Sequence, residues 1–276
     1  MDDINGGARK RTSGLKRNPI DKYYTSNKVA KMCYQLVKKY VKIKKMDYVI
    51  EPSAGSGVFI EYIKRLTNLY KFLDIKPEHA EIAKQNFLKY KIVQNREKLH
   101  IFGNPPFGRK SSTAIKFIKH SAALNADSIS FILPRSFKKA SFKKSFPLQY
   151  HLIVEKDLPE YSFIFNKMAY DVPCIFQIWE RRDYNRKPPI KQEAKSWYHF
   201  VKRPDCTISI RRVGFSIGRV KRCTQNDNIN SHWFMKIGRN DLHKIEKLNK
   251  IQFDKEKNTG AYSISKQDII LKYNKV

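Results

Sequence analysis

The chain has 276 residues, 41% of them hydrophobic, which is enough for one full α/β domain and a smaller unit. It carries 56 Lys and Arg against 25 Asp and Glu, a formal net charge of +31. This excess favours a polyanionic partner such as nucleic acid, because basic side chains neutralise phosphates and release counterions. The alternative is the lysine-rich composition of an AT-rich genome, which does not account for so few acidic residues. No apolar stretch reaches about 18 residues, which argues against a membrane span.

Residues 1–20 are rich in Gly, Asn, Arg and Lys, contain no apolar signal region, and are expected to form a flexible basic tail. The cysteines fit no Cys-x-x-Cys zinc pattern and no close pair of histidines completes one, so no metal is expected. We expect four free thiols, as in a protein of a reducing intracellular compartment, cytoplasm or nucleus, that is neither secreted nor bound to a membrane. The cysteines are Cys33, Cys174, Cys206 and Cys223.

Apolar residues repeat at helical spacing from Val29 to Val41 and predict the first helix. Strands and helices then alternate as far as residue 133. This alternation is typical of an α/β fold with a doubly wound parallel sheet. The expected strands are 48–50, 69–74, 99–102 and 128–133, and the expected helices are 58–66, 77–89 and 113–124.

A glycine-containing loop, Glu51-Pro52-Ser53-Ala54-Gly55-Ser56-Gly57, follows the first expected strand. Two glycines at this place let the backbone approach a ligand closely. The loop lacks the third glycine of the dinucleotide fingerprint and the Gly-Lys-Ser/Thr of a phosphate-binding loop. Glu51 would repel a phosphate but attract the cationic amino acid part of S-adenosylmethionine. The alternative for Glu51 is a solvated loop acid.

A second acid, Asp74, ends the next expected strand, Leu69–Asp74. A Rossmann-like sheet places a carboxylate there to hold the hydroxyl pair of a ribose. The alternative is that Asp74 caps the helix expected over 77–89.

The tetrapeptide Asn104-Pro105-Pro106-Phe107 follows the strand expected over 99–102. The Asn104 side-chain oxygen and the Pro105 carbonyl can accept hydrogen bonds from an aromatic amine and draw its lone pair out of conjugation. The two prolines fix φ near −65° and remove two N–H donors, which stiffens the segment. Phe107 offers a flat face on which a base can stack. The alternative is a simple tight turn, since Asn-Pro and Pro-Pro are common turn signals.

Together, these motifs resemble the class I S-adenosylmethionine-dependent amino-methyltransferases, and most nearly the N6-adenine methyltransferases with the gamma order of motifs. The resemblance covers roughly residues 21–180 and implies a Rossmann-like seven-stranded sheet followed by a small C-terminal recognition unit. It implies that Tyr24 and Thr25, in the stretch Asp21–Thr25, contact the methionine part of the cofactor. The expected cofactor site comprises Tyr24, Thr25, Glu51, Pro52, Ala54, Gly55, Gly57 and Asp74.

A later stretch, Leu158–Phe163, is similar to the family motif that donates an aromatic ring to the target base. The resemblance implies Phe163 as the first choice for this role, beside Phe107, and Phe165 as the second. The alternative is that both are core residues of a hairpin. The family often has an acid that holds the adenine amine, and Asn86-Phe87 stand nearest to that position here.

Two segments carry basic and aromatic residues together. Residues 135–146 predict a basic amphipathic helix whose lysines meet phosphates, or else a solvated helix that packs its phenylalanines inward. Residues 186–276, after a basic linker, are expected to form a unit that recognises nucleic acid, or else one that only completes the fold. The expected division is a tail (1–20), a catalytic domain (21–185) and this recognition region (186–276).

The expected activity is methyl transfer from S-adenosylmethionine to the N6 amine of adenine in nucleic acid, with DNA favoured by the order of motifs. RNA, including a cap-proximal adenosine, is the first alternative, because the cap-adenosine enzymes also carry Asn-Pro-Pro-Phe. Enzymes that methylate protein glutamine or guanine N2 are the second, although they usually have tyrosine at the position of Phe107. A nucleic-acid-binding module without catalysis is the third, against which Gly55, Asp74 and Asn104 argue.

Overall fold

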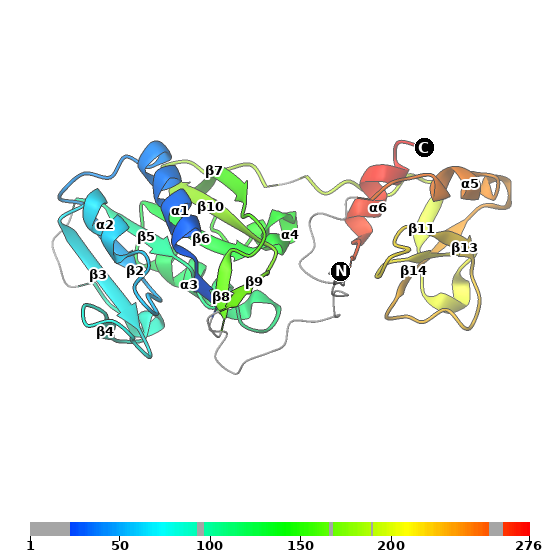
Figure 1. The fold of residues 1–276 in the computed structure, drawn as a ribbon. Helices are drawn as coiled ribbons and strands as arrows, with labels where there is room; N and C mark the ends of the chain where they lie inside the picture. The colour runs from blue at the N-terminus through cyan, green and yellow to red at the C-terminus, as the bar shows by residue number, and fades with distance from the viewer. Residues whose placement is uncertain (1–22, 93–96, 166–167, 189, 254–261) are drawn as a thin grey trace, which may run out of the picture. The chain divides into compact units, whose positions relative to one another are not determined.

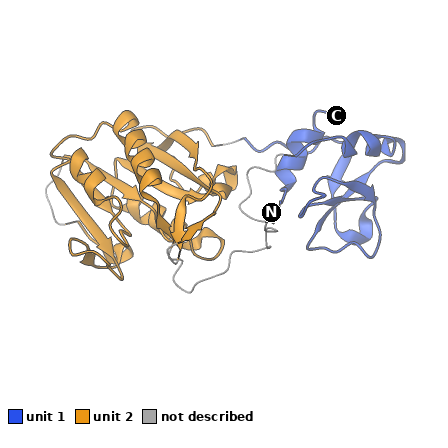
Figure 2. Cartoon of the chain, in the orientation of Figure 1, with its two compact units in different colours: residues 1–17, 190–276 blue, residues 18–189 orange. Residues whose placement is uncertain are grey.

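The computed structural model describes residues 23–92, 97–165, 168–188, 190–253 and 262–276, so the expected basic tail at 1–20 lies outside the described residues. The chain divides after Pro189 (Figure 2), near the boundary expected at 185/186. We call residues 23–189 the N-terminal unit and residues 190–276 the C-terminal unit.

A seven-stranded sheet forms the centre of the N-terminal unit and confirms the expected Rossmann-like α/β fold (Figure 1). Its strand order is β4-β3-β2-β5-β6-β10-β7. The pairs from β4 to β6 are parallel, whereas β10 runs antiparallel between β6 and β7. The strands are β2 (Tyr48–Glu51), β3 (Leu69–Asp74), β4 (Ala83–Lys84), β5 (Leu99–Gly103), β6 (Ser128–Pro134), β7 (Tyr150–Asp157) and β10 (Cys174–Arg181).

Helices cover both faces of this sheet, because the buried strands are apolar on both sides. Val49 belongs to the hydrophobic cluster that includes helices α1 (Asn27–Tyr40) and α2 (Ile60–Leu66). Its neighbours Tyr48 and Ile50 belong to the opposite cluster, which includes α3 (Ser112–Ala123). Helix α1 buries residues at helical spacing and ends where Val41 turns to an extended conformation, which confirms the first predicted helix.

The chain order reverses between β2 and β5. From β2 the chain proceeds to β3 and β4 on one side, and then returns to β5 and β6 on the other. Ligands of open α/β sheets bind beyond the carboxyl ends of the strands at such a switch point. The segments that follow β2 and β5 are the glycine-containing loop and the Asn104–Phe107 tetrapeptide.

The prediction of a helix over residues 77–89 is wrong. The chain after β3 makes turns, forms the short strand β4 and ends in a single 3-10 turn at Phe87–Lys89. Strand β4 pairs in parallel with the end of β3, and the Gln85 N–H donates to the Asp74 carbonyl at 2.8 Å. These backbone hydrogen bonds with the sheet replace the helical ones, so Asp74 caps no helix.

The prediction of one continuous amphipathic helix over residues 135–146 is also wrong. A 3-10 turn at Arg135–Lys138 and a short helix α4 (Ala140–Lys143) are separated by Lys139, whose backbone is extended. Phe137 and Phe146 are buried, and Lys138 and Lys143 form ion pairs with acidic residues of β7. Of the two alternatives considered for this segment, the structure therefore favours the one in which the phenylalanines pack inward over the one in which the lysines bind phosphates.

A second, three-stranded sheet of the N-terminal unit has the order β1-β8-β9. Strand β1 pairs antiparallel with β8, so that Thr25 lies opposite Phe163. This pairing joins the residues just before α1 to the hairpin that precedes β10. The strands are β1 (Tyr24–Thr25), β8 (Phe163–Phe165) and β9 (Met168–Tyr170).

The C-terminal unit has its own hydrophobic core beneath a four-stranded antiparallel sheet of order β11-β14-β12-β13. Its elements are β11 (Tyr198–Phe200), β12 (Ile208–Arg211), β13 (Val220–Arg222), β14 (His232–Ile237), α5 (Lys244–Asn249) and α6 (Lys266–Tyr273), with 3-10 turns at Arg203–Asp205 and Arg239–Asp241.

The expectation of four free thiols is wrong for two of the cysteines. Cys206 and Cys223 form a disulfide that joins the segments flanking β12 and β13, whereas Cys33 and Cys174 are free and buried. The two partners are 17 residues apart in sequence, and only the antiparallel pairing of β12 with β13 brings them together. No helix in the described residues has the length and apolar character needed to cross a membrane.

Candidate active site

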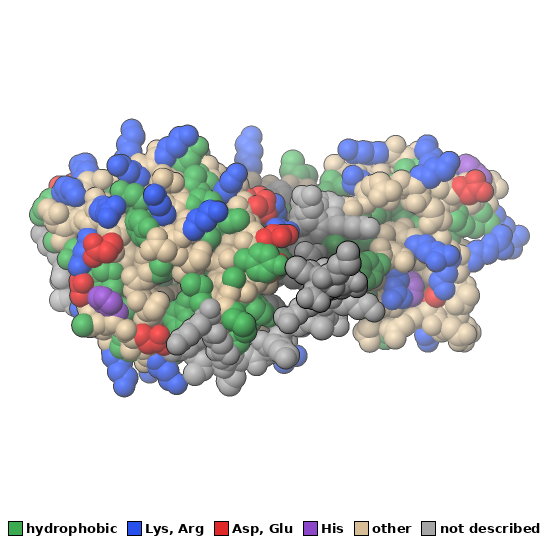
Figure 3. Space-filling model, in the orientation of Figure 1, with side chains coloured by type: hydrophobic (Ala, Val, Ile, Leu, Met, Phe, Trp, Pro, Cys, Tyr) green, Lys and Arg blue, Asp and Glu red, His purple; other side chains and the backbone are tan. Residues whose placement is uncertain are grey.

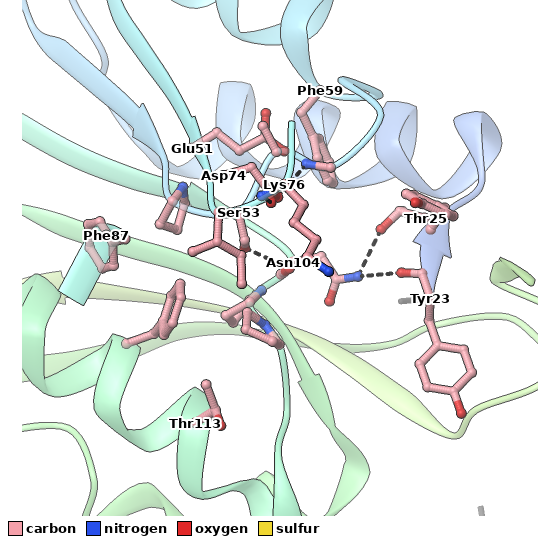
Figure 4. A pocket seen from close by; sticks show the side chains of 18 of the residues that line it. Tyr23, Thr25, Glu51, Ser53, Phe59, Asp74, Lys76, Phe87, Asn104 and Thr113 are labelled. Carbon is pink, nitrogen blue, oxygen red and sulfur yellow. Dashed lines mark hydrogen bonds between the residues drawn. The ribbon is translucent and has the colours of Figure 1, made fainter. Parts of the chain in front are cut away.

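A cavity of about 290 Å³ lies at the switch point between β2 and β5 (Figure 4). It is lined by parts of the segments that follow the parallel strands β2, β3, β4 and β5, by the segment around β1 and by two residues of α3. Most of the residues expected from the sequence meet here; Gly57, Phe163 and Phe165 do not line the cavity. The expected residues that line it are Tyr24, Thr25, Glu51, Pro52, Ala54, Gly55, Asp74, Asn104, Pro105, Pro106 and Phe107.

The two glycines of the loop after β2 take backbone conformations that other residues rarely adopt. Gly55 has φ +53°, and a Cβ atom there would lie 3.3 Å from the ring of Tyr24. Gly57 has φ +86°, and a Cβ atom there would lie 2.6 Å from the side chain of Ile60. Glycine at position 55 therefore lets the loop backbone approach the Tyr24 ring closely. Glycine at position 57 allows the turn into α2.

Asp74 ties the glycine-containing loop to the end of β3. One carboxylate oxygen accepts from the Gly55 N–H at 2.8 Å, and the other accepts from the Lys76 N–H at 2.7 Å. A carboxylate oxygen can accept more than one hydrogen bond, so both retain capacity for a diol. Asp74 thus shapes the loop and presents acceptors to the cavity at once.

Glu51 is buried rather than solvated, with 1% of its surface exposed. Its Oε2 atom has no hydrogen-bond partner among the described residues. Burial, and then the negative charge of Asp74, raise the pKa of Glu51 well above its usual value. A buried acid beside a second acid favours either protonation or a cationic ligand.

Asn104 is held in one orientation by two acceptors on neighbouring chain segments. Its Nδ2 group donates to the Tyr23 carbonyl at 3.3 Å and to the Thr25 hydroxyl at 3.2 Å (Figure 4). A backbone carbonyl can only accept, so the nitrogen must face β1 and the oxygen must face away. The Oδ1 atom is buried and has no partner among the described residues. The backbone is also fixed, because the Ser53 hydroxyl donates to the Asn104 carbonyl at 3.0 Å.

The aromatic residues expected near a target base have different surroundings. Phe107 is partly exposed and lines the cavity. Phe163 is fully buried in the core, so its ring has no face free for a base, and the first choice from the sequence is wrong. Phe165 is partly exposed and lies 5.7 Å from the ring of Tyr23, which stacks on Tyr170 at 5.3 Å. Phe165 is therefore the better placed of the two hairpin residues.

Several cavity residues were not identified from the sequence. Ile75 and Lys76 directly follow Asp74, a position that could have indicated them. Asn86, Phe87 and Leu88 lie on the cavity wall, where the Asn86 side chain accepts from the Leu88 N–H at 2.9 Å. The Asn86-Phe87 pair, which the resemblance placed nearest to an acid, thus reaches the cavity with an amide side chain. The described residues contain no cluster of His, Cys, Asp and Glu that could hold a metal ion.

Comparisons with known proteins identify similar folds. No protein-family model matches the chain, and no curated protein matches it in sequence. A proposed RNA methyltransferase from Pyrococcus horikoshii has 13% identity and a TM-score of 0.47, over 62% of this chain and 93% of that one. A modification subunit of a proposed type I restriction enzyme from Vibrio vulnificus has 16% identity and a TM-score of 0.45, over 58% of this chain and 44% of that one. A proposed class I S-adenosylmethionine-dependent methyltransferase from Listeria monocytogenes has 16% identity and a TM-score of 0.46, over 64% of this chain and 65% of that one.

Proposed function

We propose that this chain transfers a methyl group from S-adenosylmethionine to the exocyclic N6 amine of adenine in nucleic acid. The observation that carries the proposal is the buried, unpartnered Oδ1 atom of Asn104 at the switch point of the sheet, within the described residues. Leaving a buried acceptor without a partner costs about 1–3 kcal/mol, so a ligand donor is the expected compensation.

The residues of the cavity fit the proposed cofactor. Glu51 supplies a buried acceptor for a cationic amino group, and Asp74 supplies acceptors for a ribose diol. Gly55 and the exposed side of Ile75 leave room for flat or flexible groups. S-adenosylmethionine, when bound, supplies an electrophilic methyl group, which needs no metal ion. Tyr24, Pro52 and Ala54 complete the proposed site, and Gly57 supports it from outside the cavity.

Asn104 and Pro105 are proposed to activate the amine. The Asn104 Oδ1 atom and the Pro105 carbonyl accept from the two N–H groups and localise the nitrogen lone pair. Pro105 and Pro106 hold this geometry, since neither backbone φ can change much. The N–C bond forms as the bond between the methyl group and sulfur breaks, which leaves a neutral thioether. The amine proton becomes acidic only then and passes to solvent water, so positioning and fixed dipoles provide most of the acceleration.

Phe107 and Phe165 are proposed to stack on the target base. A base can reach this cavity only from a single strand or after leaving a duplex. The net charge of +31 supports a nucleic-acid substrate over a protein glutamine. The order of motifs favours DNA and RNA is the second candidate, with residues 186–276 as the proposed recognition region.

The proposal can be tested with oligonucleotides that differ only in their bases. Each would be incubated with S-adenosylmethionine carrying a labelled methyl group, as single-stranded DNA, duplex DNA and single-stranded RNA. Label should enter oligonucleotides that contain adenine and should be absent where every adenine is replaced by guanine. Equal labelling of both sets would refute the proposed adenine specificity. Labelling of casein or histones in place of nucleic acid would favour the protein-amide alternative.

A further inference from the structure

A solvent-exposed aromatic ring in the C-terminal unit is not explained by folding. Phe215 is 87% exposed and lies in the turn that connects β12 to β13. The glycines on either side of this turn, Gly214 and Gly218, both have positive φ, which gives the turn its tight path. The rings of Phe215 and Tyr262 are nearly perpendicular, with a centroid distance of 6.0 Å. A single exposed ring is ordinary, so its meaning depends on its neighbours.

Those neighbours are cations held over aromatic rings. The Arg212 guanidinium lies 4.3 Å from the centre of the Trp233 ring, and the Lys266 ammonium lies 5.3 Å from the same ring. Lys266 is also 4.9 Å from the ring of Phe200. Trp233 is itself fixed, because its Nε1–H donates to the Ile264 carbonyl at 3.0 Å. These contacts reduce the freedom of two long side chains before any ligand arrives.

Neither Arg212 nor Lys266 forms an ion pair with a carboxylate in the part of the chain that the structure describes. A guanidinium stacked on a ring keeps its N–H edge available for bidentate contacts with phosphate. On the face seen in Figure 3, Lys and Arg side chains of the described residues are more numerous than Asp and Glu. Arg212 and Lys266 can therefore attract an anionic ligand without first breaking an ion pair with a carboxylate of the described residues.

Backbone pairing joins the segment that begins at Arg212 and leads to Phe215 to the segment that leads to Lys266. Residues 212–214 run antiparallel to residues 262–264, with a bridge between Val213 and Ser263. The Ile264 N–H donates to the Arg212 carbonyl, and the Gly214 N–H donates to the Tyr262 carbonyl. We call this set of rings and cations the aromatic–basic strip, defined as Phe200, Arg212, Phe215, Trp233 and Lys266.

We propose that the aromatic–basic strip binds a single-stranded segment of nucleic acid, with Arg212 and Lys266 on phosphates and Phe215 stacked on a base. The rings of Trp233 and Phe200 are engaged by cations, which leaves Phe215 as the stacking residue. Bases inside a duplex expose no face to Phe215, so the ring discriminates between single and double strands. The inference rests on the proposed function for the nature of the polymer, but it concerns binding and not methyl transfer.

The test measures binding of the full chain to fluorescein-labelled 20-nucleotide oligonucleotides by fluorescence anisotropy, without any methyl donor. The probes are single-stranded DNA, single-stranded RNA of the same sequence and the DNA duplex. Phe215→Ala is paired with Leu271→Ala, which removes another exposed apolar side chain of the unit. Arg212→Gln and Lys266→Gln are paired with Arg239→Gln and Lys272→Gln, which remove the same charge elsewhere on the unit. Thermal melting verifies that each variant is folded.

Phe215→Ala should weaken binding of a single strand by at least about fivefold and leave duplex binding within about twofold of the wild type. Arg212→Gln and Lys266→Gln should each weaken single-strand binding at least about threefold more than their charge-matched controls. The tighter of the DNA and RNA complexes identifies the natural strand. If each strip variant weakened binding no more than its matched control, the proposed role of the strip would be refuted, since the overall charge of the chain would then account for binding. Because the assay contains no methyl donor, a chain that binds single strands through the strip but transfers no methyl group would contradict the proposed function and leave the inference standing.

Discussion

The side-chain amide of Asn104 donates a hydrogen bond to the hydroxyl of Thr25 at 3.2 Å, although the two residues are 79 positions apart in sequence. Thr25 is buried and lies in β1, whose pairing with β8 fixes it beside the end of β5. Together with the Tyr23 carbonyl, which can only accept, this contact directs the amide nitrogen of Asn104 toward β1 and its oxygen away from β1. The proposed amine substrate needs an acceptor, and the contact with Thr25 leaves the buried Oδ1 atom without a partner among the described residues.

Thr25→Val tests this positioning, because valine keeps the shape of threonine but cannot accept from the Asn104 amide. We expect the rate of methyl transfer to fall about 2- to 10-fold, which corresponds to the loss of one net hydrogen bond. Thr25→Ser retains the hydroxyl and should restore most of the rate. Single-turnover kinetics at saturating cofactor measures the effect directly. A valine variant as fast as the serine variant would contradict the assigned contact.

Cofactor binding should depend on pH through Glu51. Burial and the charge of Asp74 raise the pKa of Glu51, so it takes up a proton at a higher pH than an ordinary glutamate. The ionised form binds a cationic amino group, so the affinity of the wild type should begin to decrease, as the pH is lowered, at a higher pH than the ordinary titration of a glutamate would give. Glu51→Gln should bind more weakly at pH about 8 and show a flatter dependence. Calorimetric titration would refute this role if both proteins showed the same dependence.

The parts of the fold that follow simple periodicity were predictable from the sequence. Strand β3 was expected over its observed range, and α1 was indicated by the spacing of buried residues such as Val29 and Val37. The glycine-containing loop and Asn104 meet because both follow strands of one parallel sheet, and both strands were expected from the sequence. Local sequence was sufficient there because the side-chain pattern and the backbone preference agree.

Other features depend on contacts between distant segments and were not predictable in this way. Residues 77–89 have no helix because β4 pairs with β3, and Phe163 is buried because β8 pairs with β1. The orientation of the Asn104 amide depends on Tyr23 and Thr25, which no local pattern connects to it. The disulfide of Cys206 likewise requires the pairing of β12 with β13. In each case tertiary structure overrides the local signal.

The C-terminal unit should lose stability in acid through Asp227. This buried carboxylate accepts from the Ser209 hydroxyl and the Thr224 N–H and pairs with Lys221. Burial alone would raise its pKa, but these partners lower it to about 2. Its stabilisation is therefore present above the ordinary pKa of about 4 and is lost as the pH falls toward about 2.

Asp227→Asn should accordingly cost about 2 kcal/mol of unfolding free energy near neutral pH, and this difference should shrink below pH about 4. The exposed Asp205→Asn serves as the matched control and should stay within about 0.5 kcal/mol of the wild type. Urea denaturation monitored by circular dichroism gives both values. A constant difference between Asp227→Asn and the wild type at every pH would contradict the assigned pKa.

The thiol content of the purified chain should reflect the disulfide. Cys206 and Cys223 are paired, and Cys33 and Cys174 are free. Titration with a thiol reagent under denaturing conditions should therefore detect two thiols per chain before reduction and four after it. Four thiols in the unreduced protein would mean that the pair is open under the conditions of purification.

The most direct test of the central claim is the identity of the methylated nucleoside. Nucleic acid incubated with the enzyme and labelled S-adenosylmethionine would be digested and analysed by nucleoside mass spectrometry, with Asn104→Ala as the matched control. The account predicts N6-methyladenosine or its deoxy form with the wild type and a loss of at least about a hundredfold with the variant. Methyl groups on another nucleoside, or equal N6 methylation by Asn104→Ala, would contradict the role assigned to the buried Oδ1 atom.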